Sequence, residues 1–409
     1  MSNDSLIGDG LEHVRYLADT IGKRPTGSAG EQRAADYQCQ LLRDWGCTAV
    51  DTEPFSARGW DFGRCNVTCD SLGPMDALPI EFSASTPEGG IEAELVVCET
   101  PDVQAAQLAG RIALFYDELP AGDILVACQP AGVILAVSQR ALPWHQIIGP
   151  RTALAGRIPM VTLGFSDAVD LVRHGVQRLR LDIETTIEDV TGHNVVASLP
   201  GSATRRILVS GHYDSVPGSC AAADNATGAA CALEVLRSLG QLDLDVTVDF
   251  VNFSAEEIGL YGAAAYAESH AEALATIELG IYFDGQGDFL GRNNIHVMGQ
   301  PELVDLVRSR CVEAQYAADV QHHFTGLDQV FLSAHDVPTL WFQRSPQLTW
   351  HTRADISQDV SPAAMRASIG AAVDIARHVD SHPGAFQSGI PADQASQIRD
   401  YVANGAPCW

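Results

Sequence analysis

Apolar residues recur at helical spacing in three parts of the chain. Near the N-terminus, the spacing predicts an amphipathic helix whose apolar face is formed by Leu11, Val14, Leu17 and Ile21. A second helix is expected over 31–46. Gly46 marks its end, since glycine is favoured where a helix terminates. A third is expected to begin at Ser361, which can cap it, with Pro362 in its first turn.

Short apolar runs alternate with helical segments between residues 207 and 283. RILVSG, VTVDFVNF and IELGIYF are typical of buried strands, and 225–239 and 263–269 of the helices between them. This alternation predicts an α/β fold, a three-layer αβα arrangement around a mostly parallel central sheet. Ligands bind such sheets beyond the carboxyl ends of the strands. We therefore expect the chemistry in the loops that follow these strands.

The pattern changes over residues 78–188. Short apolar runs such as AELVVC and AGVILAV alternate there with glycine and proline, and no cluster of acidic residues and histidines forms. This predicts a small β-rich domain inserted into a larger one, which is made of residues 1–77 and 189–382. Residues 383–409 are rich in proline, glycine and serine, and we expect them to form a C-terminal tail that wraps the surface.

Composition narrows the classes of partner. The net charge of -27 argues against nucleic acid and against an anionic membrane, since both are bound by basic surfaces. No run of eighteen apolar residues occurs, so no membrane-spanning helix is expected. The N-terminal residues do not follow the pattern of a secretory signal, and the ten cysteines are scattered. We expect a cytoplasmic protein that is a monomer or a homodimer.

Four of the loops expected after strands carry acidic residues and histidines. They read GHYD with ADNATG, SAEEIG, FDGQ and TWHT, and they contain His212, Asp214, Asp224, Glu256, Glu257, Asp284 and His351. In a parallel sheet these loops converge at one edge. Three carboxylates, those of Asp224, Glu257 and Asp284, would be neutralised by two divalent ions and a bridging hydroxide. Mixed imidazole and carboxylate ligands suit two Zn²⁺ ions, with Mn²⁺ or Co²⁺ as possible substitutes.

The adjacent glutamates suggest the reaction. Neighbouring side chains in a loop point in different directions, so one glutamate can bind metal while the other handles protons. A metal pair lowers the pKa of a shared water toward about 7 and polarises a carbonyl group. The free glutamate can then take a proton and return it to a leaving amine. This combination predicts hydrolysis of an amide bond.

The motifs resemble those of the zinc-dependent aminopeptidase family of clan MH. HYDSVPGSCAAADNATGAACALEVLRSL follows the family's His-x-Asp and Asp-Asn-Ala-(Ser/Thr)-Gly block, and SAEEIGLYGAAAY follows its Glu-Glu-x-Gly-Leu-x-Gly block. RPTGSAG and NVVASLPGS are similar to its flanking segments. The resemblance implies the zinc-exopeptidase (phosphorylase/hydrolase-like) fold. It also implies that residues 78–188 form a protease-associated-like domain, as in aminopeptidase Y-like relatives.

The resemblance also implies a role for each residue of the site. His212 and Asp284 would bind one metal ion, and Glu257 and His351 the other. Asp224 would bridge the two ions. Glu256 would be the general base, and Asp214 would orient His212.

Some positions depart from the family pattern and leave the substrate open. Gly285 stands where relatives usually carry a larger residue, Gln329 where they often carry histidine, and Trp350 where tyrosine is frequent. Together with Asp328 and His323, the residues at 329 and 350 are our candidates for substrate contacts.

The expected function is that of a di-zinc exopeptidase that hydrolyses the N-terminal peptide or amide bond through a metal-bridging hydroxide. Two other enzymes on the same fold stay open: a hydrolase of a non-peptide small-molecule amide and a glutaminyl-cyclase-like acyltransferase. A binding protein that has lost catalysis is less favoured, since none of the five expected ligands is missing. The expected partner is a peptide or small amide substrate.

Overall fold

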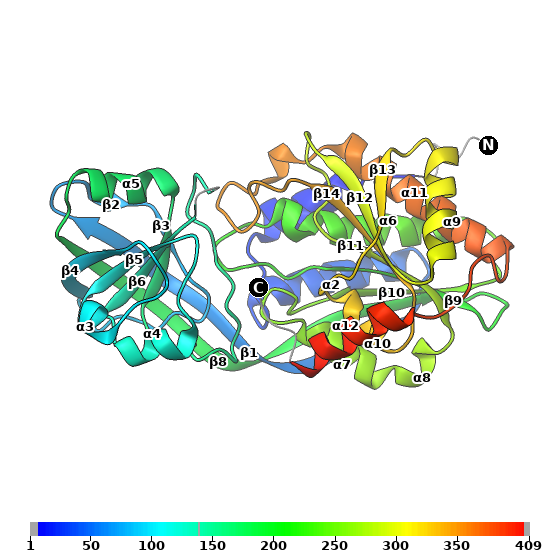
Figure 1. Ribbon diagram of the computed structural model, residues 1–409. Coiled ribbons are helices and arrows are strands. Elements are labelled where there is room, and N and C mark those ends of the chain that lie inside the picture. Colours follow the sequence, from blue (N-terminus) through cyan, green and yellow to red (C-terminus); the bar gives the residue numbers. More distant parts are fainter. Residues whose placement is uncertain (1–6, 138–139, 405–409) are drawn as a thin grey trace. The chain divides into compact units, whose positions relative to one another are not determined.

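The computed structural model describes residues 7–137 and 140–404 of the chain (Figure 1). Two compact units divide between Ala57 and Arg58 and again between Asp189 and Val190. Two long strands run through these division points: β1 (Thr48–Cys69) and β8 (Arg178–Leu199). The second unit therefore begins at Arg58 and not at residue 78, because the later half of β1 belongs to it.

The first unit is built on a mixed sheet with a parallel centre. Its strand order is β13-β12-β14-β11-β9-β10-β8. The four central strands are mutually parallel: β14 (Thr339–Ser345), β11 (Ile277–Phe283), β9 (Arg206–His212) and β10 (Thr247–Phe253). At the edges, β12 (Arg292–Met298) is antiparallel to β14 and parallel to β13 (Ala318–His322), and β8 is antiparallel to β10. The predicted mostly parallel sheet is confirmed.

Helices cover both faces of this sheet because its central strands are apolar on both sides. Ile207 and Val209 belong to one core cluster, and Leu208 between them belongs to another. The first cluster contains helices α1 (Leu11–Arg15), η2 (Tyr16–Ile21), α2 (Ala29–Asp44), α6 (Thr227–Leu239), α9 (Pro301–Glu313) and α11 (Pro362–Ser381). The second contains α7 (Tyr261–Ser269), α8 (Ala271–Leu274) and α10 (Gln329–Ala334). The three predicted layers follow from this arrangement.

Local sequence signals act where they were expected. The helix predicted from Leu11 to Ile21 is α1 continued as the π-helix η2. Helix α2 ends at Asp44, and Gly46 beyond it has a φ of 79°. The hydroxyl of Ser361 accepts a hydrogen bond from the backbone of Ala364 and so caps α11.

The C-terminal segment contains a helix that the sequence analysis did not expect. Residues Ala392–Ala403 form α12, preceded by Pro391 at its N-cap. Ile398 is 1% exposed and packs in a small apolar cluster with Val330 of α10. The proline, glycine and serine of this segment are typical of the turn before α12, and they gave no indication of the apolar face of the helix. Two further short helices are η3 (Ala222–Ala226) and η4 (Ser357–Asp359).

The second unit is rich in β structure. Strands β4 (Ile91–Cys98), β5 (Ile112–Tyr116), β6 (Gly132–Ala136) and β7 (Met160–Leu163) pair in parallel, and β3 (Ala77–Pro79) pairs with β7. The hairpin strand β2 (Gly73–Met75) pairs with β1. Its helices are α3 (Ala105–Leu108), α4 (Gly122–Cys128) and α5 (Phe165–Arg173). That this unit is a protease-associated-like domain stays a prediction.

Within the described ranges, 7–137 and 140–404, no helix is both long enough and apolar enough to cross a bilayer.

Candidate metal centre

The parallel strands of the first unit end at the same level. Phe253 at the end of β10 is paired with His212 at the end of β9. Phe283 at the end of β11 is paired with Gly211 on one side and with Phe342 of β14 on the other. The loops after these strands therefore start from one edge of the sheet, as the sequence pattern predicted.

These loops bring six side chains into two groups of metal-ligand type. One group consists of His212, Glu256 and Asp284, and the other of Asp224, Glu257 and His351. Within each group, one ligand atom from each residue lies within 4.8 Å of the others. All six residues are buried or nearly so, and Asp284 is the most exposed at 9%.

Asp224 connects the two groups. Its Oδ1 lies 3.4 Å from Nε2 of His212, and its Oδ2 lies 3.2 Å from Nε2 of His351. Nε2 of His351 is also 3.0 Å from Oε2 of Glu257, whereas Nε2 of His212 is 3.6 Å from Oδ1 of Asp284. One carboxylate thus offers a different oxygen to each group, which is the arrangement that a bridging ligand needs.

Glu256 lies within the first group. Its Oε2 is 3.9 Å from Nε2 of His212, so distance alone does not separate a proton-transferring glutamate from a ligand. Glu257, its neighbour, points into the second group. The two adjacent glutamates therefore point into different groups.

Asp214 fastens the loops after β9 and β10 to each other. Its carboxylate accepts hydrogen bonds from the backbone N–H groups of Glu256 and Glu257, at 3.2 and 3.3 Å. The same carboxylate lies 3.4 Å from Nδ1 of His212. Asp214 is 1% exposed, so these contacts are made away from solvent.

The backbone of the site is held in uncommon conformations. His351 has a φ of 59°, and Ala255, which precedes the paired glutamates, has a φ of 61°. Non-glycine residues rarely adopt this left-handed region, and such strain concentrates at functional sites.

Burial and mutual repulsion control the ionisation of the carboxyl groups. Burial raises the pKa of Glu257 to about 7 although His351 opposes it, and burial raises the pKa of Asp284. Burial also raises the pKa of Glu256 well above its usual range, and Asp328 and Glu257 raise it further. For Asp224 burial acts in the same direction, but the nearby imidazoles of His212 and His351 outweigh it and lower the pKa.

The two imidazoles shift in the opposite sense. Burial by itself would lower the pKa of His351, but Glu257 and Asp224 raise it to about 10. For His212 burial is again outweighed by nearby carboxylates, and its pKa rises well above the usual range. The surrounding carboxylates thus favour positive charge on His212 and His351, the two histidines that contact Asp224.

The donor atoms fit divalent cations. Among the described residues, neither ring nitrogen of His212 has a hydrogen-bond partner, and neither does Oε1 of Glu257. Buried polar atoms are otherwise almost always satisfied. Imidazole nitrogen and carboxylate oxygen together are a donor set that suits zinc.

The predicted substrate contacts fall into two kinds. Asp328 and Gln329 are buried, and they bond to Tyr282 and Thr325, whose hydroxyls lie 3.2 and 2.5 Å away. Trp350 is partly exposed, and its ring centroid is 4.4 Å from that of His351.

His323 is exposed and lies against the ring of His296, with 5.5 Å between centroids. The contacts of all four candidates with substrate stay predictions.

Two buried charged residues of the site were missed by the sequence analysis. Arg24 contacts the loop after β9 from the RPTG segment, and Asp355 contacts the backbone of Asp224. The sequence marks RPTGSAG only by its similarity to a flanking segment of the family, and Asp355 follows His351 by four residues. Burial lowers the pKa of Arg24 to about 10 and raises that of Asp355 to about 7.

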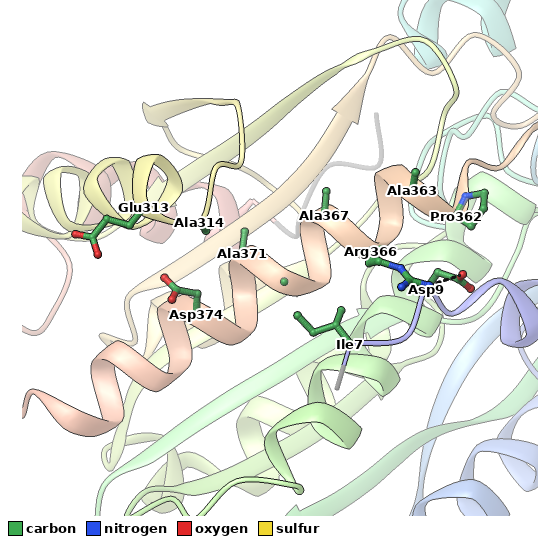
Figure 2. Close-up of a pocket in the computed structure, with 11 residues that line it drawn as sticks. Ile7, Asp9, Glu313, Ala314, Pro362, Ala363, Arg366, Ala367, Ala371 and Asp374 are labelled. Atoms are coloured by element: carbon green, nitrogen blue, oxygen red, sulfur yellow. Dashed lines mark hydrogen bonds and ion pairs between the residues drawn. The ribbon is translucent and has the colours of Figure 1, made fainter. Parts of the chain in front are cut away.

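A separate cavity of about 680 Å³ lies along α11 in the first unit and contains none of these residues (Figure 2). It is lined by residues of α11, including Arg366 and Asp374, by Ile7 and Asp9, and by Glu313 and Ala314 at the end of α9.

Part of the chain matches a known protein family. Residues 194–376 match the family model of peptidase family M28. A probable lipoprotein aminopeptidase, LpqL of Mycobacterium tuberculosis, is 28% identical over 299 residues, which are 67% of this chain and 58% of that protein. Human carboxypeptidase Q is 27% identical over 68% of this chain and 65% of its own length.

Aminopeptidase YwaD of Bacillus subtilis is 31% identical over 63% of this chain and 57% of its own length. The chain therefore spans less than two thirds of the length of the curated relatives that it matches.

Solved structures share the fold. A zinc aminopeptidase from Bacillus subtilis superposes with a TM-score of 0.75 at 21% identity, covering 94% of this chain and 97% of that one. A peptidase M28 precursor from Shewanella amazonensis gives 0.80 at 20% identity, covering 93% and 95%. A glutaminyl cyclase from Porphyromonas gingivalis gives 0.53 at 15% identity, covering 91% and 99%. Residues 194–376 contain every member of both ligand groups, and this part of the chain matches peptidase family M28.

Proposed function

We propose that this protein is a zinc-dependent aminopeptidase that holds two metal ions and hydrolyses the N-terminal bond of a peptide or small amide. The observation that carries the proposal is the pair of ligand groups joined by Asp224, whose two oxygens lie 3.4 and 3.2 Å from the two histidines. His212 and Asp284 would hold one ion and Glu257 and His351 the other.

The charge of the site supports two dications. Seven carboxyl groups are buried in and around it: Asp214, Asp224, Glu256, Glu257, Asp284, Asp328 and Asp355. Burying so many ionised carboxylates without counter-charge is costly. Two divalent cations would offset four of these charges and would satisfy the buried donor atoms of His212 and Glu257.

Bound zinc supplies a Lewis acid that polarises the scissile carbonyl and lowers the pKa of water. The protein itself has to move a proton from the attacking water to the leaving amine. Glu256 suits this task because it is buried beside His212 and burial raises its pKa, so it takes up a proton readily and can release it again. Asp214 would hold Glu256 through its backbone and orient His212.

The acidic character of the site favours the amino end of a substrate. An ammonium group is attracted by the excess of carboxylates, whereas a C-terminal carboxylate would be repelled. The similarity to aminopeptidase YwaD points the same way, although carboxypeptidase Q is also similar to this chain.

The test is turnover of aminoacyl-anilides against N-acetylated versions of the same compounds, with purified protein of measured zinc content. We expect cleavage of the free-amine compounds and at least about 100-fold slower cleavage of the blocked ones. Equal turnover of both would contradict an aminopeptidase and favour a hydrolase of other amides. Ammonia release from N-terminal glutamine peptides without anilide cleavage would favour the glutaminyl-cyclase reaction.

A further inference from the structure

Arg24 is a fully buried cation whose guanidinium, among the described residues, donates to backbone carbonyls. It is 0% exposed, and its guanidinium donates to five carbonyl oxygens. Two of these belong to its own neighbourhood, Leu17 and Gly22, at 3.0 and 2.7 Å. The other three belong to the loop between β9 and η3, namely Tyr213, Cys220 and Ala221, at 2.8, 3.0 and 3.0 Å.

Asp355 binds the end of the same loop through the opposite kind of backbone group. Its Oδ1 accepts from the N–H of Ala223 at 2.7 Å, and its Oδ2 accepts from the N–H of Asp224 at 3.1 Å. Asp355 is 1% exposed. Arg24 and Asp355 come from distant parts of the sequence, yet both are fixed to residues 220–224.

The two contacts fix four backbone groups within five residues. Arg24 holds the carbonyls of Cys220 and Ala221, and Asp355 holds the amides of Ala223 and Asp224. Ala221 has a φ of 52°, a left-handed conformation that a non-glycine residue adopts only when its surroundings impose it.

The purpose of this arrangement is not stability alone. A buried ion is a poor way to stabilise a fold, because apolar residues of similar volume often do as well or better. The hydrogen bonds of Arg24 and Asp355 orient individual backbone groups, and they thereby determine the path of the chain that leads into Asp224. The position of Asp224 in turn decides whether its two oxygens can reach both ligand groups.

We propose that Arg24 and Asp355 are positioning residues that set the backbone of Asp224 so that one carboxylate can serve both metal ions. The inference rests on the proposed two-metal site. Neither residue belongs to either ligand group, so both would act through Asp224.

The experiment compares zinc affinity with stability in Asp355→Asn, Arg24→Lys and a control pair. Arg310 of α9 and Asp374 of α11 form a bidentate ion pair at 2.8 and 3.0 Å, and Asp374 borders the cavity of Figure 2. Asp374→Asn and Arg310→Lys make the same chemical changes away from the ligand loops. Zinc binding is measured by competition with a chromophoric chelator, and the Tm of each metal-free variant is measured alongside.

We expect Asp355→Asn to bind one of its two zinc ions about 10–100-fold more weakly, as when an outer partner of a ligand is lost. Arg24→Lys should act in the same direction, since an ammonium group cannot reach the same set of carbonyls. Both control variants should bind two ions with the affinity of the unmodified protein, whatever their Tm.

Unchanged zinc affinity in Asp355→Asn would overturn the inference, as would an affinity loss that the control variants share at equal loss of Tm. If Arg24→Lys fails to fold, Asp355→Asn decides, because it keeps the volume of the side chain. If the unmodified protein binds no zinc, the proposed function fails first. If it binds two ions and both variants do as well, only the positioning role fails.

Discussion

Oδ2 of Asp224 lies 3.2 Å from Nε2 of His351, although the two residues belong to loops 127 positions apart in the sequence. The same carboxylate reaches His212 with its other oxygen. This contact makes two separate ligand groups into one candidate centre, and most of the expected behaviour of the protein follows from it.

Glu256→Gln separates proton transfer from metal binding. Glutamine keeps the shape of the side chain but cannot accept the proton, so we expect kcat to fall by about 10²–10⁴ with two zinc ions retained. The adjacent Glu257→Gln is the matched control, and it should lose zinc because Glu257 lies 3.0 Å from His351. Steady-state rates and zinc content of the two variants check this. A Glu256→Gln variant with unchanged rate would remove Glu256 from its role, and one that loses zinc would make it a ligand.

His351→Ala should remove one metal ion and not both. The second ligand group would keep Asp224 and Glu257, whereas the first would keep all its members. We expect about one zinc ion per chain and activity reduced by at least about 100-fold. The control is His335→Ala, because this exposed histidine belongs to neither group. Full zinc content in the His351 variant would show that the second group does not bind metal.

The convergence of the ligand-type loops could be predicted from the sequence because of a simple topological rule. The carboxyl ends of parallel strands share an edge, so the rule predicts from sequence that residues such as Asp224, Asp284 and His351 lie close together. Which glutamate belongs to which group could not be predicted from position alone. Oε2 of Glu256 lies 3.9 Å from Nε2 of His212, a distance that suits both a metal ligand and a proton-transferring group.

Contacts with backbone groups could not be predicted. Arg24 and Asp355 act on carbonyls and amides whose directions depend on the folded path of the loop, and no residue pattern encodes these directions. The boundary at residue 58 was missed for a related reason. The long strands β1 and β8 contribute to both units, so the apolar pattern does not change where the units divide.

Asp288→Asn is expected to change the pH dependence of stability. Burial raises the pKa of Asp288 to about 6, and its Oδ2 has no hydrogen-bond partner among the described residues. Because the folded-state pKa lies above the ordinary value, the folded state binds the proton more tightly, and stability falls as the pH rises from about 4 to about 6. Above pH 6 the variant should be more stable by roughly 1 kcal/mol, an amount reduced by the partial exposure of the group.

Urea unfolding at pH 4 and at pH 7.5 checks this difference. The gain should be present at pH 7.5 and nearly absent at pH 4. The exposed Glu268→Gln on α7 is the control that removes a carboxylate elsewhere in the same unit. A variant that is less stable than the unmodified protein at pH 7.5 would contradict the destabilising role of the ionised carboxylate.

The most direct test of the account is a zinc titration of chelator-stripped protein that follows activity and bound metal together. We expect an inactive, less thermostable metal-free protein, with activity returning as zinc binds and reaching its plateau at two ions per chain. Full activity in protein that elemental analysis shows to be free of metal would contradict it, and so would a plateau reached at one ion per chain.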